Sequence, residues 1–244
     1  MNEQDMIQVD QVTKEFGTVR AVCDLTLRIP RGQLYCFLGP NGAGKTTTIK
    51  MMTGLLRPTR GSVRVGGIDL REDPVAAKKI TGYIPDFPFL YERLTPVEFF
   101  QFTGDLYGLS RGRVDDELEQ AFLLFGLDDY RKSLIKDLSH GYRQRLAYAS
   151  TFLHNPEVLF VDEPFVGLDP YTIRLIKDLL RRRAREGMTI FMTTHILALI
   201  EDLADRIGII VKGRLAAEGT LGELVTQTRL EEGSLEDVFF SLAK

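Results

Sequence analysis

The chain has 244 residues, of which 44% are hydrophobic, and this length allows one large domain or one domain that carries a smaller lobe. Its 31 Lys and Arg residues nearly balance its 34 Asp and Glu residues, and the net charge of −3 argues against a protein held to nucleic acid mainly by positive charge. No apolar run exceeds five residues, whereas a membrane-spanning helix needs about 20, so we expect no segment to cross a bilayer.

The N-terminal part of the chain predicts strands followed by one helix. Leu25, Leu27 and Ile29 alternate with polar residues, which is typical of a half-buried strand. The run Leu34–Leu38 is apolar throughout, as expected for a strand buried on both faces of a parallel sheet. A loop over 39–44, a helix over 45–53 and a short strand over 62–65 follow.

Residues 95–155 predict a helical lobe inserted into an α/β domain. The segment Thr95–Glu98 combines an N-cap residue, a Pro at the first helical position and the Glu of a capping box. Helices are expected from there to about residue 107, over about 114–125, and through the stretch that Asn155 and Pro156 end.

Beyond the lobe, strands and helices alternate again. Strands are predicted over 158–161, 189–193 and 207–211, and helices over 170–186 and 196–204. This alternation implies a mostly parallel α/β sheet with right-handed connections. We therefore expect one domain, with an α/β core over 1–94 and 156–219, the lobe over 95–155 and a tail of two short helices over 220–244.

A phosphate-binding loop is predicted over residues 39–46, which fit the pattern G-x-x-x-x-G-K-[ST] between a buried strand and a helix. Glycines let backbone N–H groups turn around a phosphate, and the helix N-terminus adds partial positive charge. Lys45 is expected to reach the β- and γ-phosphates, Thr46 to bind Mg²⁺ and Thr47 to contact the α-phosphate. Chance alone produces the pattern in about 1% of such chains, which favours nucleotide binding over a simple turn. The predicted nucleotide-binding residues here are Gly39, Pro40, Asn41, Gly42, Ala43, Gly44, Lys45, Thr46 and Thr47.

Two adjacent acids, Asp162 and Glu163, end the apolar run over 158–161. Asp162 is placed to hold Mg²⁺, and Glu163 could orient and deprotonate an attacking water. Strands often end in exposed acids, but the position of this pair in a second βα unit of the same sheet favours the functional interpretation. Because neighbouring residues of a strand point to opposite faces, both acids can serve one site only if the chain turns there.

A third motif, LSHGYRQR over residues 138–145, separates the possible families of nucleotide-binding proteins. It resembles the LSGGQ-type signature of ATP-binding cassette (ABC) proteins, in a variant with His140 and Tyr142. Ser139 and Gly141 match the signature, and Ser139 also suits the N-cap of a helix. The resemblance implies an ABC transporter ATP-binding subunit with the α/β P-loop NTPase fold, in which a mostly parallel sheet is joined by an antiparallel β part at the N-terminus and an inserted helical lobe. It further implies a dimer that sandwiches two ATP–Mg²⁺, in which Ser139 and Gly141 clamp the nucleotide of the partner.

Other segments follow the order of this family. The resemblance implies that Phe16 stacks on adenine, although a Phe at a strand end is more often part of a core, and that His195 contacts the γ-phosphate. Residues 167–170 match the D-loop, with Val166 where Ser is common. Asp86 stands where the family usually has a Gln that touches Mg²⁺ and the attacking water. A carboxylate there could bind the metal more strongly or repel the γ-phosphate, and we expect Asp86 to keep the metal-sensing role.

A transporter subunit without a spanning helix requires an integral-membrane permease from another chain, and the resemblance implies a groove for that permease just after Asp86. Residues 87–107 hold seven aromatic residues, whereas about two are expected at average composition. Most of them are expected to fill the core of the lobe. The run Phe87–Leu90 is expected to dock the permease, because an apolar run broken by Pro fits poorly into a helix.

The predicted function is ATP hydrolysis that powers the permease, with a second ATP-binding subunit, identical or not, as the other partner. The resemblance of Gly233–Phe239 to the C-terminus of drug, lipid and polysaccharide exporter ATPases favours export. We expect a cytoplasmic protein held at the membrane through the permease.

Two other functions remain as alternatives. One is a non-transport ABC ATPase that acts on ribosomes or DNA, but such proteins usually carry two cassettes or a coiled-coil insertion. The other is a regulatory module without turnover, which the presence of both Glu163 and His195 disfavours. The arginine-rich stretch over 181–185 is interpreted as a solvated helix face, so no nucleic-acid partner is expected.

Overall fold

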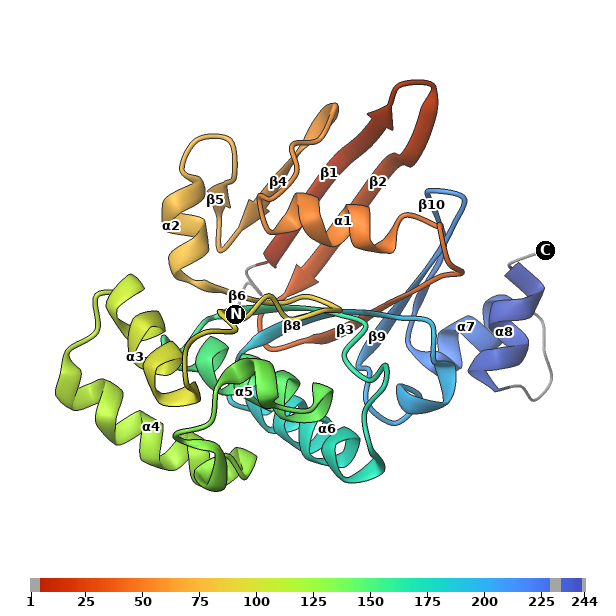
Figure 1. Ribbon diagram of the computed structural model, residues 1–244. Helices are drawn as coiled ribbons and strands as arrows, with labels where there is room; N and C mark the ends of the chain where they lie inside the picture. The colour runs from red at the N-terminus through yellow and green to blue at the C-terminus, as the bar shows by residue number, and fades with distance from the viewer. Residues whose placement is uncertain (1–4, 229–233, 243–244) are drawn as a thin grey trace.

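The computed structural model describes residues 5–228 and 234–242, which form two β-sheets covered by helices (Figure 1). The first sheet is antiparallel, which confirms the antiparallel part predicted at the N-terminus. Ile7 pairs with Ile29 on one side and with Val65 on the other, so buried apolar residues of three strands share one face. The strand order is β2 (Val19–Pro30), β1 (Asp5–Phe16), β4 (Arg60–Val65) and β5 (Ile68–Asp69).

The second sheet is parallel except for one edge strand, as the alternation of strands and helices predicts. Leu38 pairs with Thr194 and Asp162 with Thr193, so the carboxyl ends of β3, β8 and β7 lie side by side. Ligands of open α/β sheets bind at this edge. The strand order is β10 (Arg214–Gly219), β9 (Arg206–Val211), β3 (Leu34–Leu38), β8 (Thr189–Thr194), β7 (Val158–Asp162) and β6 (Thr81–Ile84).

Strand β3 is buried on both faces, as its continuous apolar run predicts. Tyr35 and Phe37 belong to the core that the strands share with α1 (Lys45–Met52), the helix that lies between the two sheets (Figure 1). Leu34 and Leu38 belong to the second core, which extends beneath the parallel sheet into the helical part of the molecule. The loop that follows β3 is therefore held from both sides.

Three helices of the middle segment pack together below the parallel sheet in Figure 1: α3 (Pro96–Leu106), α4 (Arg111–Phe125) and α5 (His140–Phe152). Two short 3₁₀ turns lie between α4 and α5. The capping box predicted at the start of α3 is confirmed, since Thr95 Oγ1 accepts from the N–H of Glu98 and the Glu98 carboxylate accepts from the N–H of Thr95. Phe100 and Phe122 meet edge to face in the core of this lobe.

The remaining helices are α2 (Pro74–Lys79), α6 (Pro170–Arg185), α7 (Leu221–Gln227) and α8 (Leu235–Leu242). The sequence analysis missed α2, although Asp73 and Pro74 are an N-cap and a first-turn Pro that could have revealed it. It also missed the short strand β5 and the edge strand β10. Within the described residues, no helix has the length and apolar character needed to span a membrane.

The prediction of a helix over 196–204 is wrong. Only a 3₁₀ turn over Leu197–Leu199 forms, followed by further turns before β9. Ile200 and Leu203 are buried in the same core as Leu235 of α8, and Glu201 accepts a hydrogen bond from the N–H of Leu235 at 2.9 Å. These tertiary contacts outweigh the helical propensity of the short apolar run.

We predict that Gly208→Ala destabilises the fold, because a Cβ at this position of β9 would lie 2.2 Å from the buried hydroxyl oxygen of Tyr35. Overpacking of this kind lowers the free energy of unfolding by about 1–3 kcal/mol, measurable by urea denaturation. Gly112→Ala in the first turn of α4 is the control, since a Cβ there meets no atom within 4 Å. An unchanged urea midpoint for Gly208→Ala would show that Tyr35 yields easily.

Candidate functional site

A cleft of about 380 Å³ lies at the carboxyl edge of the parallel sheet. It joins the loop after β3 to residues that follow β6, β7 and β8, and Ala21 of β2 closes one side. The structure thus brings together most of the site residues predicted from sequence. The cleft is lined by Ala21, Asn41, Gly42, Gly44, Lys45, Thr46, Thr47, Asp86, Glu163, Val166 and His195.

The phosphate-binding loop needs glycine for two distinct reasons. Gly42 and Gly44 adopt φ values of 78° and 109°, which L side chains rarely tolerate. At Gly39 the limit is space, because a Cβ would lie 2.5 Å from the carbonyl oxygen of Ile210. The loop therefore leads β3 into α1 without side chains that would block the approach of a phosphate.

The N-terminus of α1 opens into the cleft with its backbone N–H groups free of side-chain caps. Gly44 is the N-cap, and the first turn carries no acidic residue. Four N–H groups at a helix start have no partner within the helix and attract anions. Lys45 reinforces this charge, because its buried Nζ donates to the carbonyl oxygen of Gly39 at 2.7 Å and lies 3.5 Å from Glu163 Oε1.

Asp162 is the last residue of β7 and is almost completely buried. The hydroxyl of Thr193 on the neighbouring strand donates a hydrogen bond to its carboxylate. Burial raises the pKa of Asp162 above its usual range, and hydrogen bonds from Thr193 and Thr46 oppose that shift. The carboxyl therefore contacts the hydroxyl of Thr46, which lines the cleft, whereas Asp162 itself is buried behind the lining residues.

Glu163 lies where the chain turns out of the sheet, with a left-handed φ of 47°. Such a backbone costs a residue other than Gly about 1–2 kcal/mol, and the N–H of Glu163 is held by the carbonyl oxygen of Thr193 at 3.0 Å. The carboxylate faces His195, whose backbone N–H and Nδ1 lie 3.2 and 2.9 Å from Glu163 Oε2. The turn is the one required for Asp162 and Glu163 to serve one site.

The oxygen donors at the base of the cleft fit Mg²⁺. The ion prefers hard oxygen ligands, usually takes one or two carboxylates from the protein, and completes its shell with water and substrate phosphates. Thr46, Asp162 and Asp86 supply one hydroxyl and two carboxylates, and Asp86 lies near enough to raise the pKa of Asp162. Between residues 5–228 and 234–242, no cluster of three His, Cys, Asp or Glu side chains offers an all-protein cage.

Some predicted residues lie outside the cleft. Phe16, at the end of β1, is half exposed, and Lys14 Nζ lies 5.1 Å above its ring. Ser139 and Gly141 lie at the start of α5, where the Ser139 hydroxyl caps the helix by accepting from the N–H of Tyr142. None of the residues lining the cleft comes from α5. Gly39, Pro40 and Ala43 shape the loop, since the N–H of Ala43 donates to the carbonyl oxygen of Pro40.

The sequence analysis missed Thr193. Its hydroxyl and its carbonyl oxygen contact both acids of the site, and its position two residues before His195, at the end of a predicted strand, was the available signal. Val166 also lines the cleft, although from sequence it appears only as a departure from the family pattern.

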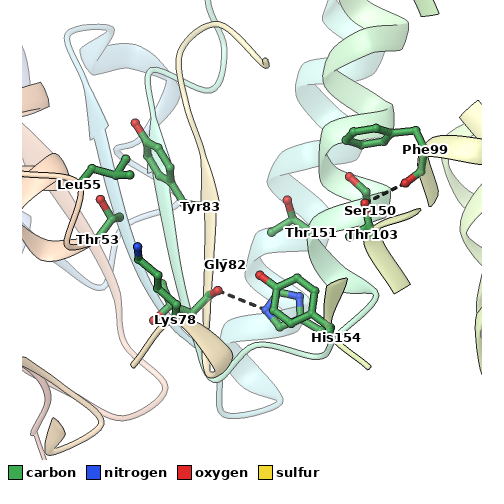
Figure 2. Close-up of a pocket in the computed structure, with 12 residues that line it drawn as sticks. Thr53, Leu55, Lys78, Gly82, Tyr83, Phe99, Thr103, Ser150, Thr151 and His154 are labelled. Atoms are coloured by element: carbon green, nitrogen blue, oxygen red, sulfur yellow. Dashed lines mark hydrogen bonds between the residues drawn. The ribbon is translucent and has the colours of Figure 1, made fainter. Parts of the chain in front are cut away.

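A second cleft, of about 390 Å³, lies between the parallel sheet and the helical lobe (Figure 2). Leu55, Lys78 and Tyr83 lie on one side in Figure 2, and Phe99 and Thr151 on the other. Tyr107, which also lines it, stacks on His154 with ring centroids 3.7 Å apart. His154 Nε2 donates to the carbonyl oxygen of Thr81 at 3.2 Å, and burial lowers the pKa of the imidazole.

The prediction that most aromatic residues of 87–107 fill the core is wrong. Of the seven, only Phe99 and Phe100 are buried, and Phe102 is partly buried. The other four are exposed, because Phe87, Phe89 and Tyr91 precede the capped start of α3 and Tyr107 lies just past its end. Phe87 and Phe89 are 56% and 85% exposed, which leaves an apolar patch beside Asp86.

A family profile described as ABC transporter matches residues 22–166. A probable multidrug ABC transporter ATP-binding protein, YbhF of Escherichia coli (strain K12), is 37% identical over 98% of this chain and 42% of its own length. The daunorubicin/doxorubicin resistance ATP-binding protein DrrA of Streptomyces peucetius is 39% identical over 89% of this chain and 66% of its own. The chain thus spans less than two thirds of these relatives.

Solved structures share the fold. One described as the ATP-binding subunit of an ABC transporter superposes with a TM-score of 0.93 at 33% identity and covers 98% of this chain and 100% of its own. The dimeric, post-hydrolysis ATP-binding cassette MJ0796, bound to ADP and Pi, superposes with a TM-score of 0.79 over 88% of this chain and 99% of its own. At 23% identity the second likeness concerns the fold alone. Both confirm the predicted P-loop NTPase fold.

We predict that Asp162→Asn stabilises the chain alone at neutral pH. Because the pKa of this carboxyl is raised, the folded state holds the proton more tightly than the unfolded chain does. The protonated carboxyl therefore stabilises the fold at low pH, and this contribution is lost as the pH rises through the raised pKa. The amide removes the buried charge, so the free energy of unfolding at pH 7 should rise by about 0.5–2 kcal/mol and depend less on pH between 4 and 7. Urea denaturation at several pH values measures this, and a destabilised variant contradicts it.

Proposed function

Since the chain belongs to the ABC transporter family, we propose that it is the ATP-binding and ATP-hydrolysing subunit of a transporter whose channel is a separate membrane protein. The observation that carries the proposal is the 380 Å³ cleft, where Lys45, Glu163 and His195 come within contact distance at the N-terminus of α1. A protein that only binds nucleotide has no need of a carboxylate there.

ATP binds with its phosphates at the start of α1. The uncapped N–H groups and Lys45 supply positive charge for the β- and γ-phosphates, and Thr47 contacts the α-phosphate. Phe16 stacks on the adenine through its half-exposed ring at the end of β1. Lys45 already points at Glu163, so an arriving γ-phosphate competes with that carboxylate for the ammonium.

Thr46, Asp162 and Asp86 would hold Mg²⁺, and the ion would neutralise charge on the phosphates. Burial makes ionisation of the Asp162 carboxyl unfavourable, so a neighbouring cation would stabilise its charged form. Asp86 keeps the metal-sensing role from its loop at the rim of the cleft.

Hydrolysis uses the chain's own Glu163 and His195. A water attacks the γ-phosphorus, the bond to the bridging β–γ oxygen breaks, and Glu163 takes the proton from the water, giving ADP and inorganic phosphate. His195 contacts Glu163 through both Nδ1 and its backbone N–H, which orients the carboxylate. The same imidazole lies at the cleft and steadies the γ-phosphate.

Completion of the site requires a second ATP-binding subunit. Ser139 and Gly141 lie at the start of α5 and outside the cleft of their own chain, so they act on the nucleotide of the partner. Ser139 caps α5, and the helix N-terminus carries the partial positive charge that suits a γ-phosphate. Two ATP molecules are thereby held between two subunits.

The membrane permease docks beside Asp86. Phe87 and Phe89 offer exposed apolar rings, and the second cleft offers a groove between the sheet and the helical lobe (Figure 2). A helix of the permease fits such a groove through one apolar face. The substrate moves through the permease, and export is favoured by the names of the relatives, which include drug-resistance proteins. Docking holds the chain at the cytoplasmic face of the membrane.

We predict that Glu163→Gln dimerises on addition of ATP and Mg²⁺. The amide cannot take a proton from water, so ATP persists between the subunits and the sandwich accumulates. Size-exclusion chromatography with light scattering should show a monomer without nucleotide and a dimer with it. Lys45→Ala in the same background is the control and should stay monomeric, because it loses the phosphate contact. A Glu163→Gln chain that is monomeric under both conditions would contradict the ATP sandwich.

We also predict that Phe89→Asp abolishes co-purification with the permease, because the new charge would have to be buried in an apolar contact. ATP binding, measured by equilibrium titration, should stay within about twofold of the wild type, since Phe89 does not line the nucleotide cleft. Val75→Asp, which alters another exposed apolar residue, on α2, is the control. Retention of the permease by Phe89→Asp would contradict docking at this run.

A further inference from the structure

His140 departs from the signature pattern, and its surroundings suggest what it does. The side chain leaves the first residue of α5, directly after Ser139, and is half-buried. Its ring lies beside that of Phe87, with centroids 6.3 Å apart and planes inclined by 25°. Phe87 in turn meets Phe89 edge to face at 6.2 Å. The imidazole therefore contacts the exposed run that follows Asp86.

The same ring also lies near the segment between β7 and α6. A Cβ at Gly167 would lie 3.5 Å from His140 Cδ2 and 3.7 Å from Nε2, so the imidazole borders the space beside Gly167, whose φ is 71°. Gly141 lies similarly close to this segment, since a Cβ there would be 3.7 Å from Asp169 Oδ2. Any residue other than Gly at 167 would be strained and would also meet the ring.

Three functional segments thus meet at one side chain. Phe87 follows Asp86, which lines the nucleotide cleft, and Gly167 follows Val166, which also lines it. Ser139 precedes His140 at the start of α5. A ring wedged between the two cleft-lining segments fixes the start of α5 relative to both of them.

We propose that His140 is a positioning residue that holds the start of α5 against the segments over 86–90 and 166–170. When the permease binds at Phe87 and Phe89, this packing transmits the change to Ser139 and Gly141, which clamp the ATP of the partner. The proposal rests on the proposed function where it assigns Ser139 and Gly141 to the nucleotide of a second subunit. The ring acts through packing, and a ring without nitrogen should replace it. His140 does not itself need to touch the nucleotide.

Amide hydrogen exchange of the full chain without nucleotide tests the packing directly. His140→Ala should raise exchange in peptides that cover 86–91 and 163–169, because both segments lose the ring that covers them. Tyr130→Ala is the matched control, because the Tyr130 ring packs against Tyr142 in the same first turn of α5, with centroids 4.2 Å apart and planes inclined by 43°, and Tyr130 lies outside both segments. If His140→Ala raises exchange only in residues around 140, or if Tyr130→Ala raises exchange in the two segments equally, the proposal is overturned.

ATP-driven dimerisation of the Glu163→Gln chain tests the consequence. Adding His140→Ala should raise the dissociation constant of the dimer about threefold or more. Adding His140→Phe should leave this constant unchanged, and adding His140→Asn should raise it as much as His140→Ala does. Adding Phe87→Ala to His140→Ala should weaken the dimer no further, since the two rings act as one unit. A strong dimer with His140→Asn and a weakened dimer with His140→Phe would indicate a polar contact with phosphate and overturn the proposal. A Glu163→Gln chain that never dimerises would refute the ATP sandwich, while the exchange experiment would still decide the role of His140.

Discussion

The contact between Thr193 and the end of β7 is the constraint on which the nucleotide site depends. Its hydroxyl donates to Asp162, and its carbonyl oxygen accepts from the N–H of Glu163. These bonds tie β7 to β8 where both strands end and hold Glu163 in a left-handed turn. Because β3 pairs with β8 on the other side, Lys45 meets the same edge. Three segments that are far apart in sequence thus converge through strand register.

The site is assembled at a cost to the stability of the chain alone. Asp162 is a buried carboxyl with a raised pKa, Lys45 is a buried cation, and Glu163 has an unfavourable backbone conformation. The 3.5 Å contact between Lys45 and Glu163 offsets part of this cost. A phosphate beside Lys45 and a cation beside Asp162 would offset more of it, so the features that destabilise the free protein are those that favour binding. Functional sites commonly lower the stability of the free protein while they favour binding of its ligand.

The helical lobe carries two features that lie outside the nucleotide cleft, the start of α5 and the second cleft. Its α5 presents Ser139 and Gly141 away from the cleft of the same chain, which leaves them for a second subunit. Its boundary with the sheet forms the other cleft, and the exposed rings of Phe87 and Phe89 follow β6, whose residues line that cleft. His140 at the start of α5 packs near Phe87 and Gly167. Each of these two residues follows one that lines the nucleotide cleft.

The sequence by itself determined the elements whose signal is local. The glycine loop, the apolar run of β3, the capping box at Thr95 and the acid pair after β7 are each contained in a few neighbouring residues, so spacing and chemistry were enough to predict them. Only the tertiary structure decided what depends on distant partners. Thr193 became part of the site through strand pairing, the apolar run over 196–200 formed turns because it packs against α8, and the aromatic residues of 87–91 stayed exposed because α3 begins after them. No local pattern carries that information, because the free energy of burial depends on which segments meet.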